Sequence, residues 1–145
     1  RRQTEEALFA VDPDTGSTSI LLTEKDDAWV NLDQSMPKWL PDGSAFLWTT
    51  ERNGWWQLEY RSRDGRVIGA ITTPEFRYKG FVDLDAESKV VHLVGGEDPT
   101  QSHLYRLEFG GLQNRLTQLT NEVGFHSAIF SEDIPHPVSE IDTIP

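Results

Sequence analysis

Short apolar runs alternate with polar residues along the chain, and the runs have the length of β-strands. In the clearest case, residues 56–61, three large apolar or aromatic side chains alternate one by one with polar ones. This period of two predicts strands with one buried face, and no segment keeps the helical period for three turns. We therefore expect little helix, and antiparallel strands over residues 7–11, 18–22, 45–49, 56–60 and 89–94.

Glycines next to Asp, Asn, Thr or another Gly separate these runs. Such short sequences provide the positive φ angles that tight hairpins require. Turns are therefore expected at Asp14-Thr15-Gly16, Pro41-Asp42-Gly43, Asn53-Gly54, Asp64-Gly65 and Gly110-Gly111.

A strand that runs into a turn recurs three times, beginning at Leu8, Leu58 and Leu104. These leucines are 50 and then 46 residues apart, and each turn leads to a strand that ends in threonine. A second match, of residues 39–42 with residues 130–133, has a separation of 91 residues. A period of roughly 40–50 residues with about four strands per repeat is typical of propeller blades. A β-sandwich with evenly spaced strands is the alternative.

The same pattern predicts the core. Blades are expected to meet near Met36 and near Tyr78. The side chains expected to be buried are large and apolar: Trp39, Phe46, Trp48, Leu58, Val91, Leu93, Leu104, Leu107 and Phe130.

Composition narrows the classes of function. The formal net charge of -11, from 13 basic and 24 acidic residues, has the wrong sign for phosphate backbones, so we expect no nucleic-acid partner. No apolar run approaches the roughly 20 residues of a membrane span, so we expect no membrane contact from this segment. Without cysteine there is no disulfide framework or thiolate chemistry. Because the chain starts at Arg1 rather than Met, we expect a fragment, and a signal or anchor can lie upstream.

The segment from Trp39 to Trp55 reads WLPDGSAFLWTTERNGW. It resembles the N-terminal propeller of the dipeptidyl peptidase IV family, in the prolyl oligopeptidase clan, where an aromatic-x-Pro-Asp-Gly start and a strand lead to Ser-Glu-Arg-x-Gly-Trp. Similar segments follow in the family's order at residues 103–106, 115–117 and 126–131. The likeness covers residues 1–133, which we interpret as a partial β-propeller.

Two departures from the family pattern stand out. Residues 58–61 read Leu-Glu-Tyr-Arg where the family usually has Leu-Tyr-Arg-Tyr, which changes the aromatic residue that faces the core. Residues 134–145 contain Pro135 and Pro137, which disturb ladder pairing, so an irregular or disordered end is expected.

The resemblance implies an all-β fold, a β-propeller fragment with about two complete four-stranded antiparallel blades and partial blades at each end. It also implies a serine-type dipeptidyl peptidase, a hydrolase that is periplasmic or secreted in a bacterium and has a C-terminal α/β-hydrolase domain in the same polypeptide. That enzyme would remove N-terminal dipeptides with Pro or Ala in the second position from peptide substrates, while the propeller caps the hydrolase domain and gates substrate. Uncovered edges would let the fragment self-associate. The alternative is a stand-alone propeller module that binds a protein or glycan partner.

No catalytic, cofactor-binding or metal-ligating residue is assigned in this chain, and no cofactor is expected. The nucleophile of the related hydrolases lies in a Gly-x-Ser-x-Gly elbow, and this motif is absent from the sequence. Ser44, Ser88 and Ser127 fall at turn or strand positions. His126 precedes Ser127, but neighbouring strand residues point to opposite faces. The fragment alone should therefore be inactive.

Two acidic and aromatic features come closest to a binding site. Members of the family hold the substrate's amino terminus with a glutamate pair, but Glu5-Glu6 lies directly before a strand and lacks the aromatic-flanked setting of the family motif, so solvated charges are the favoured interpretation. Trp55-Trp56 beside Arg52 suggests a platform for a sugar or a cation, with an anchor at the start of a strand as the default.

The histidines and one glycine-rich stretch are expected to be structural. His92, His103, His126 and His136 have no metal-ligand spacing. Residues 95–99, Gly-Gly-Glu-Asp-Pro, lack the Lys and Ser or Thr of a phosphate loop, which indicates a loop between strands.

Overall fold

The computed structural model describes residues 3–131 and 140–144, and of the last five only the backbone. The chain divides into two compact units, residues 1–72 and residues 73–145. Each contains a four-stranded antiparallel sheet and a two-stranded antiparallel sheet. The described residues include no helix that is long and apolar enough to cross a membrane.

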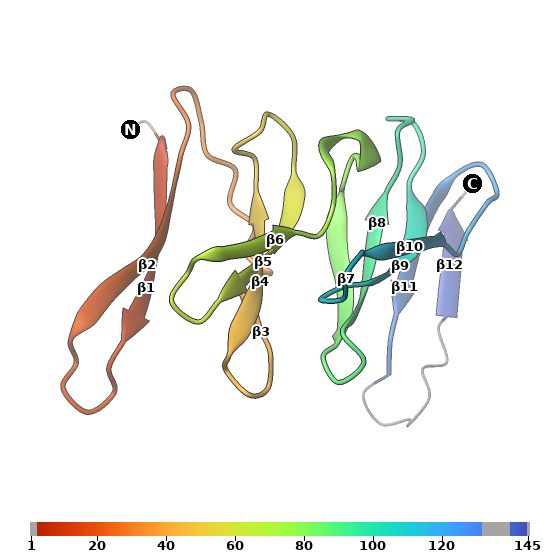
Figure 1. Cartoon of the computed structure of the whole chain (residues 1–145). Coiled ribbons are helices and arrows are strands. Elements are labelled where there is room, and N and C mark those ends of the chain that lie inside the picture. Colours follow the sequence, from red (N-terminus) through yellow and green to blue (C-terminus); the bar gives the residue numbers. More distant parts are fainter. Residues whose placement is uncertain (1–2, 132–139, 145) are drawn as a thin grey trace. The chain divides into compact units, whose positions relative to one another are not determined.

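The first unit consists of a hairpin followed by a four-stranded meander (Figure 1). In the hairpin, β1 (Glu5–Val11) pairs with β2 (Thr18–Lys25), so that Glu6 lies opposite Glu24. The meander has the order β3-β4-β5-β6, with β3 (Lys38–Trp39), β4 (Ala45–Thr50), β5 (Gln57–Ser62) and β6 (Val67–Ala70). The outer strand β6 is turned strongly relative to β4 in Figure 1, which is the ordinary twist of an antiparallel sheet.

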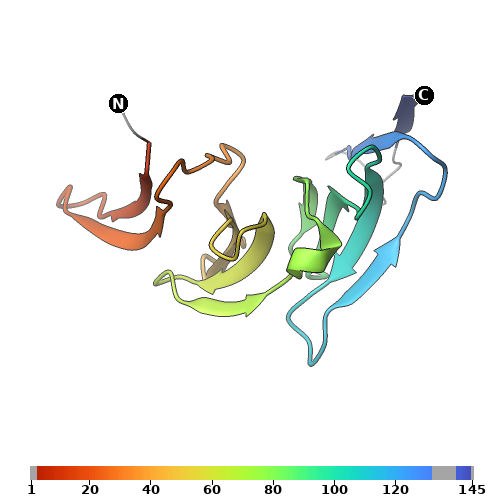
Figure 2. The same cartoon turned by 90° about the horizontal axis from the view of Figure 1, so that it is seen from above.

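Strand β4 is the buried centre of the first unit. All six of its residues are buried, whereas β6 is largely exposed. Leu22 of the hairpin packs against Phe46 and Trp48 of β4, and half-buried Leu8 and Met36 complete this core cluster. Figure 2 shows the two layers from above, with the hairpin in red and orange and the meander mainly in yellow.

The second unit begins with a short 3₁₀ helix, η1 (Pro74–Phe76). Its meander has the order β10-β9-β8-β7, with β7 (Gly80–Asp85), β8 (Val90–Gly95), β9 (His103–Glu108) and β10 (Arg115–Gln118). A second sheet pairs β11 (Phe125–Ile129) with β12 (Glu140–Ile144). The centre of the meander is again its most buried part, since Val91 and Leu93 of β8 and Leu104 and Leu107 of β9 are all buried.

The predicted strands and the repeat are confirmed. Each of the five strands is present, with ends that differ from the prediction by three residues or fewer. Leu8, Leu58 and Leu104 lie in β1, β5 and β9, and these strands turn into β2, β6 and β10. The expected threonine ends are wrong, because β2 ends at Lys25, β6 at Ala70 and β10 at Gln118. The chain passes from one sheet to the next in the connections that contain Met36 and Tyr78, as expected. The two four-stranded meanders thus have the strand order of propeller blades.

The predicted core is right at seven of nine positions and differs at the two aromatic residues near sheet ends. Phe46, Trp48, Leu58, Val91, Leu93, Leu104 and Leu107 are buried. The prediction for Trp39 is wrong, because this residue lies on the two-residue edge strand β3 and is 41% exposed. The centroid of its ring lies 4.6 Å from that of Phe46. Phe130 is only half-buried.

Most of the predicted irregular end lies outside the described residues. This applies to residues 134–139 and to Pro145. Residues 140–144, by contrast, form β12 and pair in register with β11, with Glu140 opposite Ile129. The two prolines precede this segment, so they do not interrupt its ladder, and this part of the end is a strand.

Candidate functional site

The first unit has a polar pocket between its hairpin and its meander. The pocket has a volume of about 290 Å³. Glu6 and Glu24 line it from the hairpin, Arg52 and Trp56 from the turn after β4, and Val30 from the connection between the two sheets. Charged groups therefore gather where two sheets meet, next to an apolar core.

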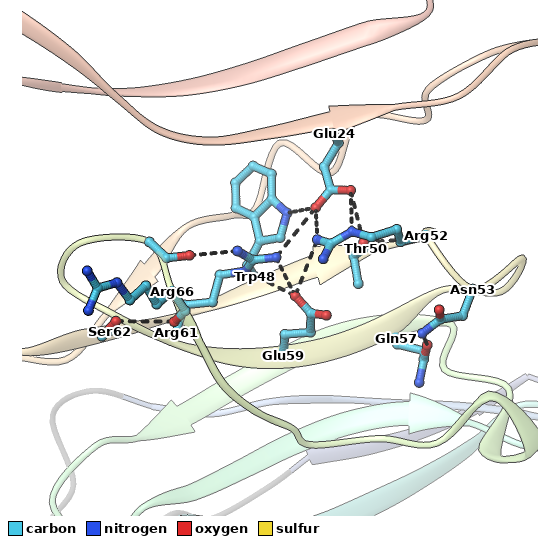
Figure 3. A network of polar contacts seen from close by, with 11 residues as sticks. Glu24, Trp48, Thr50, Arg52, Asn53, Gln57, Glu59, Arg61, Ser62 and Arg66 are labelled. Carbon is cyan, nitrogen blue, oxygen red and sulfur yellow. Dashed lines mark hydrogen bonds and ion pairs between the residues drawn. The ribbon is translucent and has the colours of Figure 1, made fainter.

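Glu24 is the centre of this group, shown in Figure 3. It is nine-tenths buried, because the alternation along β2 places it on the same inward face as Leu22. Its carboxylate accepts hydrogen bonds from Trp48 Nε1 at 3.2 Å and Thr50 Oγ1 at 3.1 Å, both from β4. Arg52 Nη2 donates to Glu24 Oε1 at 2.7 Å. One hairpin carboxylate thus binds three groups of the meander.

Arg61 and Glu59 extend the group along β5. Arg61 donates to Glu59 Oε2 from Nη2 at 2.6 Å and from Nε at 3.0 Å, and its Nη1 donates to the carbonyl oxygen of Gly65 at 2.7 Å. Its Nη2 also lies 3.7 Å from Glu24 Oε1. Together with Arg52 the group has two carboxylates and two guanidinium groups, so its formal charges cancel. We call Glu24, Arg52, Glu59 and Arg61 the charge cluster.

Arg52 connects the charge cluster to the pocket. About half of its side chain is exposed, and it lies 3.7 Å from Glu59 as well as in direct contact with Glu24. The hydrogen bond to Glu24 raises the pKa of the Arg52 guanidinium, although partial burial opposes this. Arg52 is therefore a permanent positive charge in the wall of a pocket that is also lined by Lys25 and by several carboxylates.

Glu6 is not a member of the charge cluster, although it lies opposite Glu24 in the hairpin. Like charges directly across a ladder repel each other. Burial, followed by the charges of Glu24 and Asp33, raises the pKa of Glu6 above its ordinary value of 4.5. The folded state therefore holds a proton on Glu6 more tightly than the unfolded chain does.

We expect this carboxyl to make the first unit more stable as the pH falls from neutrality toward 4.5, because the folded state takes up the proton first. Glu6→Gln should reduce that gain, as measured by urea unfolding at about pH 7 and about pH 5, the range in which a carboxyl with a raised pKa titrates. Glu5→Gln, which removes an equal charge from the opposite face, is the matched control and should keep the gain. An unchanged gain in Glu6→Gln would contradict the prediction.

The connection between the hairpin and the meander is fastened around the same pocket. Thr49 Oγ1 donates to Asp33 Oδ2 at 2.9 Å, and Asn31 Nδ2 donates to Glu51 Oε2 at 2.7 Å. The amide of Val30 donates to the carbonyl oxygen of Gln3 at 2.8 Å. The loop is thus bound to both layers, and the pocket has defined walls.

The glutamate pair does not act as a pair. Glu5 points to the exposed face and forms an ion pair with Lys25 at 3.1 Å, whereas Glu6 lines the pocket. Strand geometry separates neighbouring side chains in this way. Of the suggested platform, Arg52 and Trp56 line the same pocket, while Trp55 is half exposed.

The serines and the glycine-rich stretch lie in the turn, strand and loop positions that the sequence indicates. Ser44 donates to Asp42 Oδ1 in a turn at 2.8 Å. Ser127 is exposed on β11 while its neighbour His126 is buried. Gly95 is the last residue of β8, and residues 96–99 belong to the loop between β8 and β9, where the Asp98 carbonyl oxygen accepts a hydrogen bond from Lys79 Nζ at 2.9 Å.

Three of the four histidines are described and lie in the second unit, while His136 lies outside the described residues. His92 is on β8, His103 on β9 and His126 on β11. Over the described part of the chain, no three acidic or imidazole groups are placed to hold a metal ion.

Sequence reasoning missed Glu24 and Arg61, which make most of the hydrogen bonds of the charge cluster. A signal for Glu24 is present, since it follows Leu22 by two residues in a strand and so shares its inward face. A signal for Arg61 is present too, two residues after Glu59 on the same strand. The charges of Glu24, Arg52, Glu59 and Arg61 are paired with one another, which makes the charge cluster a joint between the two sheets of the unit.

Comparison with known proteins places these features in a family context. The model of the family described as "Dipeptidyl peptidase IV (DPP IV) N-terminal region" matches residues 1–143. The crystal structure of Porphyromonas gingivalis dipeptidyl peptidase 4 superposes with a TM-score of 0.76 and 22% sequence identity, over 89% of this chain and 18% of that one. This likeness shows the fold, and with the two four-stranded meanders it confirms a β-propeller fragment over a β-sandwich. The chain spans less than a fifth of the length of the protein it matches.

Proposed function

The chain belongs to the family of dipeptidyl peptidase IV N-terminal regions, and we propose from this that it is a non-catalytic part of the propeller of a serine dipeptidyl peptidase. In the complete protein the propeller caps an α/β-hydrolase domain of the same polypeptide and restricts the access of substrate. The complete enzyme removes dipeptides with Pro or Ala in the second position from the amino terminus of peptides.

The match of the family model over nearly the whole chain is the observation that carries this proposal. The chemistry of the described residues is consistent with a scaffold. An acyl transfer requires a nucleophile, a base within roughly 2.6–3.2 Å of it and donors for the oxyanion. The serines discussed above lie in turns or on exposed strand positions, and the buried ionisable groups of the first unit are neutralised by their partners. The chain therefore supplies walls and shape, and the chemistry belongs to the hydrolase domain.

Hydrolysis of a chromogenic Ala-Pro or Gly-Pro anilide tests the proposal. We expect no turnover by residues 1–145 alone, because they contain no Gly-x-Ser-x-Gly elbow. The product of the complete gene should be active and should lose its activity when the serine of its elbow is changed to alanine.

Two outcomes would contradict the proposal. Turnover by the purified chain that disappears in Ser127→Ala would place the chemistry in this chain. A complete gene product with no elbow and no activity would favour a propeller that binds a protein or glycan partner.

A further inference from the structure

Imidazole rings join β11 to the four-stranded meander of the second unit. Near the start of β11, His126 stacks on His103 of β9, with ring centroids 5.4 Å apart and planes 20° apart. Just after its end, Phe130 stacks on His92 of β8, with centroids 4.4 Å apart and planes 29° apart. We call these two ring contacts the histidine junction.

Backbone hydrogen bonds reinforce the first of these contacts. The amide of Ser102 donates to the carbonyl oxygen of Gly124 at 3.0 Å, and the amide of His126 donates to the carbonyl oxygen of Ser102 at 2.8 Å. Toward its other end, β11 depends on side chains such as Phe130 for its position against the sheet. That end should respond most strongly to a change in His92.

His92 lies in a row of charged residues across the sheet. Asp83 of β7 and Arg106 of β9 are its direct cross-strand partners. The residue is nine-tenths buried, and its Nδ1 is buried without a hydrogen-bond partner. A neutral ring tolerates this position against Phe130, but a protonated ring would place an extra buried N–H where it has no acceptor.

The charged groups around His92 only partly compensate for the cost of burying a protonated ring. Burial lowers the pKa of His92, Asp83 opposes the shift, Arg106 adds to it, and Asp85 opposes it again. From the side of β11 the group that faces His92 is the uncharged ring of Phe130. The neutral form is therefore the form that fits the folded unit.

Hydrogen bonds hold both rings of the other contact in place. His126 Nε2–H donates to the carbonyl oxygen of Glu122 at 2.7 Å, and His103 Nε2 lies 3.2 Å from Gln101 Oε1. Lys79 Nζ donates to the main-chain oxygen of Gln101 as well. The pH response of the junction is therefore assigned to His92.

We propose that the histidine junction is a pH-sensitive contact that holds β11 and β12 on the meander at neutral pH and releases them in mild acid. The unfolded or released chain binds a proton on His92 more readily than the packed junction does. Stability of the packed state is thus fully present above the ordinary histidine pKa of about 6.5 and is lost as the pH falls below it. The proposal goes beyond the proposed function and does not depend on it.

Amide hydrogen exchange of the 145-residue chain tests the proposal. After correction for the intrinsic pH dependence of exchange, protection of residues 125–129 should fall about tenfold or more between about pH 7.5 and about pH 5.5, the range in which histidine titrates. Strands β4 and β5 are the internal control, because residues 1–72 contain no histidine. His92→Phe keeps a ring against Phe130 without a titrating group and should remove most of the fall.

A second measurement covers the case in which that variant fails to fold. The imidazole Cε1–H resonance of His92 in the unchanged chain should titrate below pH 6.5, the ordinary value for histidine. A midpoint at or above that value would overturn the proposal. So would equal protection of β11 at both pH values, a fall that is as large in β4 and β5, or a fall that His92→Phe leaves unchanged.

Discussion

Replacing Arg61 with methionine is expected to lower the free energy of unfolding of the first unit by about 3–5 kcal/mol, the usual effect of removing one partner from a buried ion pair. The side chain of Arg61 is 5% exposed, and its partners Glu59 and Glu24 are 10% and 9% exposed. Methionine fills a similar volume but leaves two carboxylates with only Arg52, half of whose side chain faces solvent. The carbonyl oxygen of Gly65 loses its donor as well.

Tryptophan fluorescence during urea unfolding measures this effect directly. All five tryptophans lie within residues 29–56, so their signal reports the first unit. Arg66→Met is the matched control, since the Arg66 side chain is 86% exposed and its ion pair with Asp64 lies at the surface. A change in Arg61→Met as small as in this control would show that the charge cluster contributes little.

A second substitution, in Glu59, distinguishes the loss of the ion-pair attraction from the cost of leaving buried carboxylates without a partner. If the effect of Arg61→Met comes mainly from stranded carboxylates, adding Glu59→Leu should restore part of the stability, because apolar groups can replace a buried pair at little loss. If stability falls further, the pair itself contributes to it. The energies of neighbouring groups are not additive, so the double variant is needed.

The fold could be predicted from the sequence because its strongest signals are local. Each of the five predicted turns contains a glycine with a positive φ angle, and hairpins set by such turns fix the register of the strands they join. The repeat of Leu8, Leu58 and Leu104 adds the period of the blades. Trp39 shows the limit of predicting burial from hydrophobicity. Its side chain is exposed because β3 is a short edge strand, and the hydrophobic pattern does not reveal the length of that strand.

The charge cluster could not be predicted in the same way, because it is assembled across long sequence separations. Glu24 meets Trp48, Thr50 and Arg52 only when the hairpin packs on the meander. Strand alternation, by contrast, is local, and it places the neighbours Glu5 and Glu6 on opposite faces of β1. Alternation in a strand predicts the face on which a charge lies, but the partner on that face comes from tertiary structure.

Gly65→Ala is expected to have the largest effect of the single substitutions, at or above the roughly 4–5 kcal/mol that marks exceptional cases. Gly65 lies in the turn between β5 and β6 with φ +85°, and a Cβ placed on it would lie 2.0 Å from the carbonyl oxygen of Leu21. That oxygen belongs to the backbone of β2, so it cannot rotate away as a side chain does. The hairpin would have to move from the meander, which would also pull Glu24 from the charge cluster.

Gly54→Ala is the control that has the backbone strain without the close contact. Gly54 has φ +83°, but nothing lies within 4 Å of the place that an alanine methyl group would take. We expect about 1–2 kcal/mol for this control, the usual strain of an L-residue in the left-handed region. Urea unfolding followed by tryptophan fluorescence compares the two variants under one protocol. If Gly65→Ala loses no more stability than Gly54→Ala, the hairpin and the meander do not approach as closely as the structure indicates. A large difference would show that the close approach of Gly65 to Leu21 lies at the joint that the charge cluster holds. A shift of β2 at this joint would disturb the backbone contact and the ion pairs together.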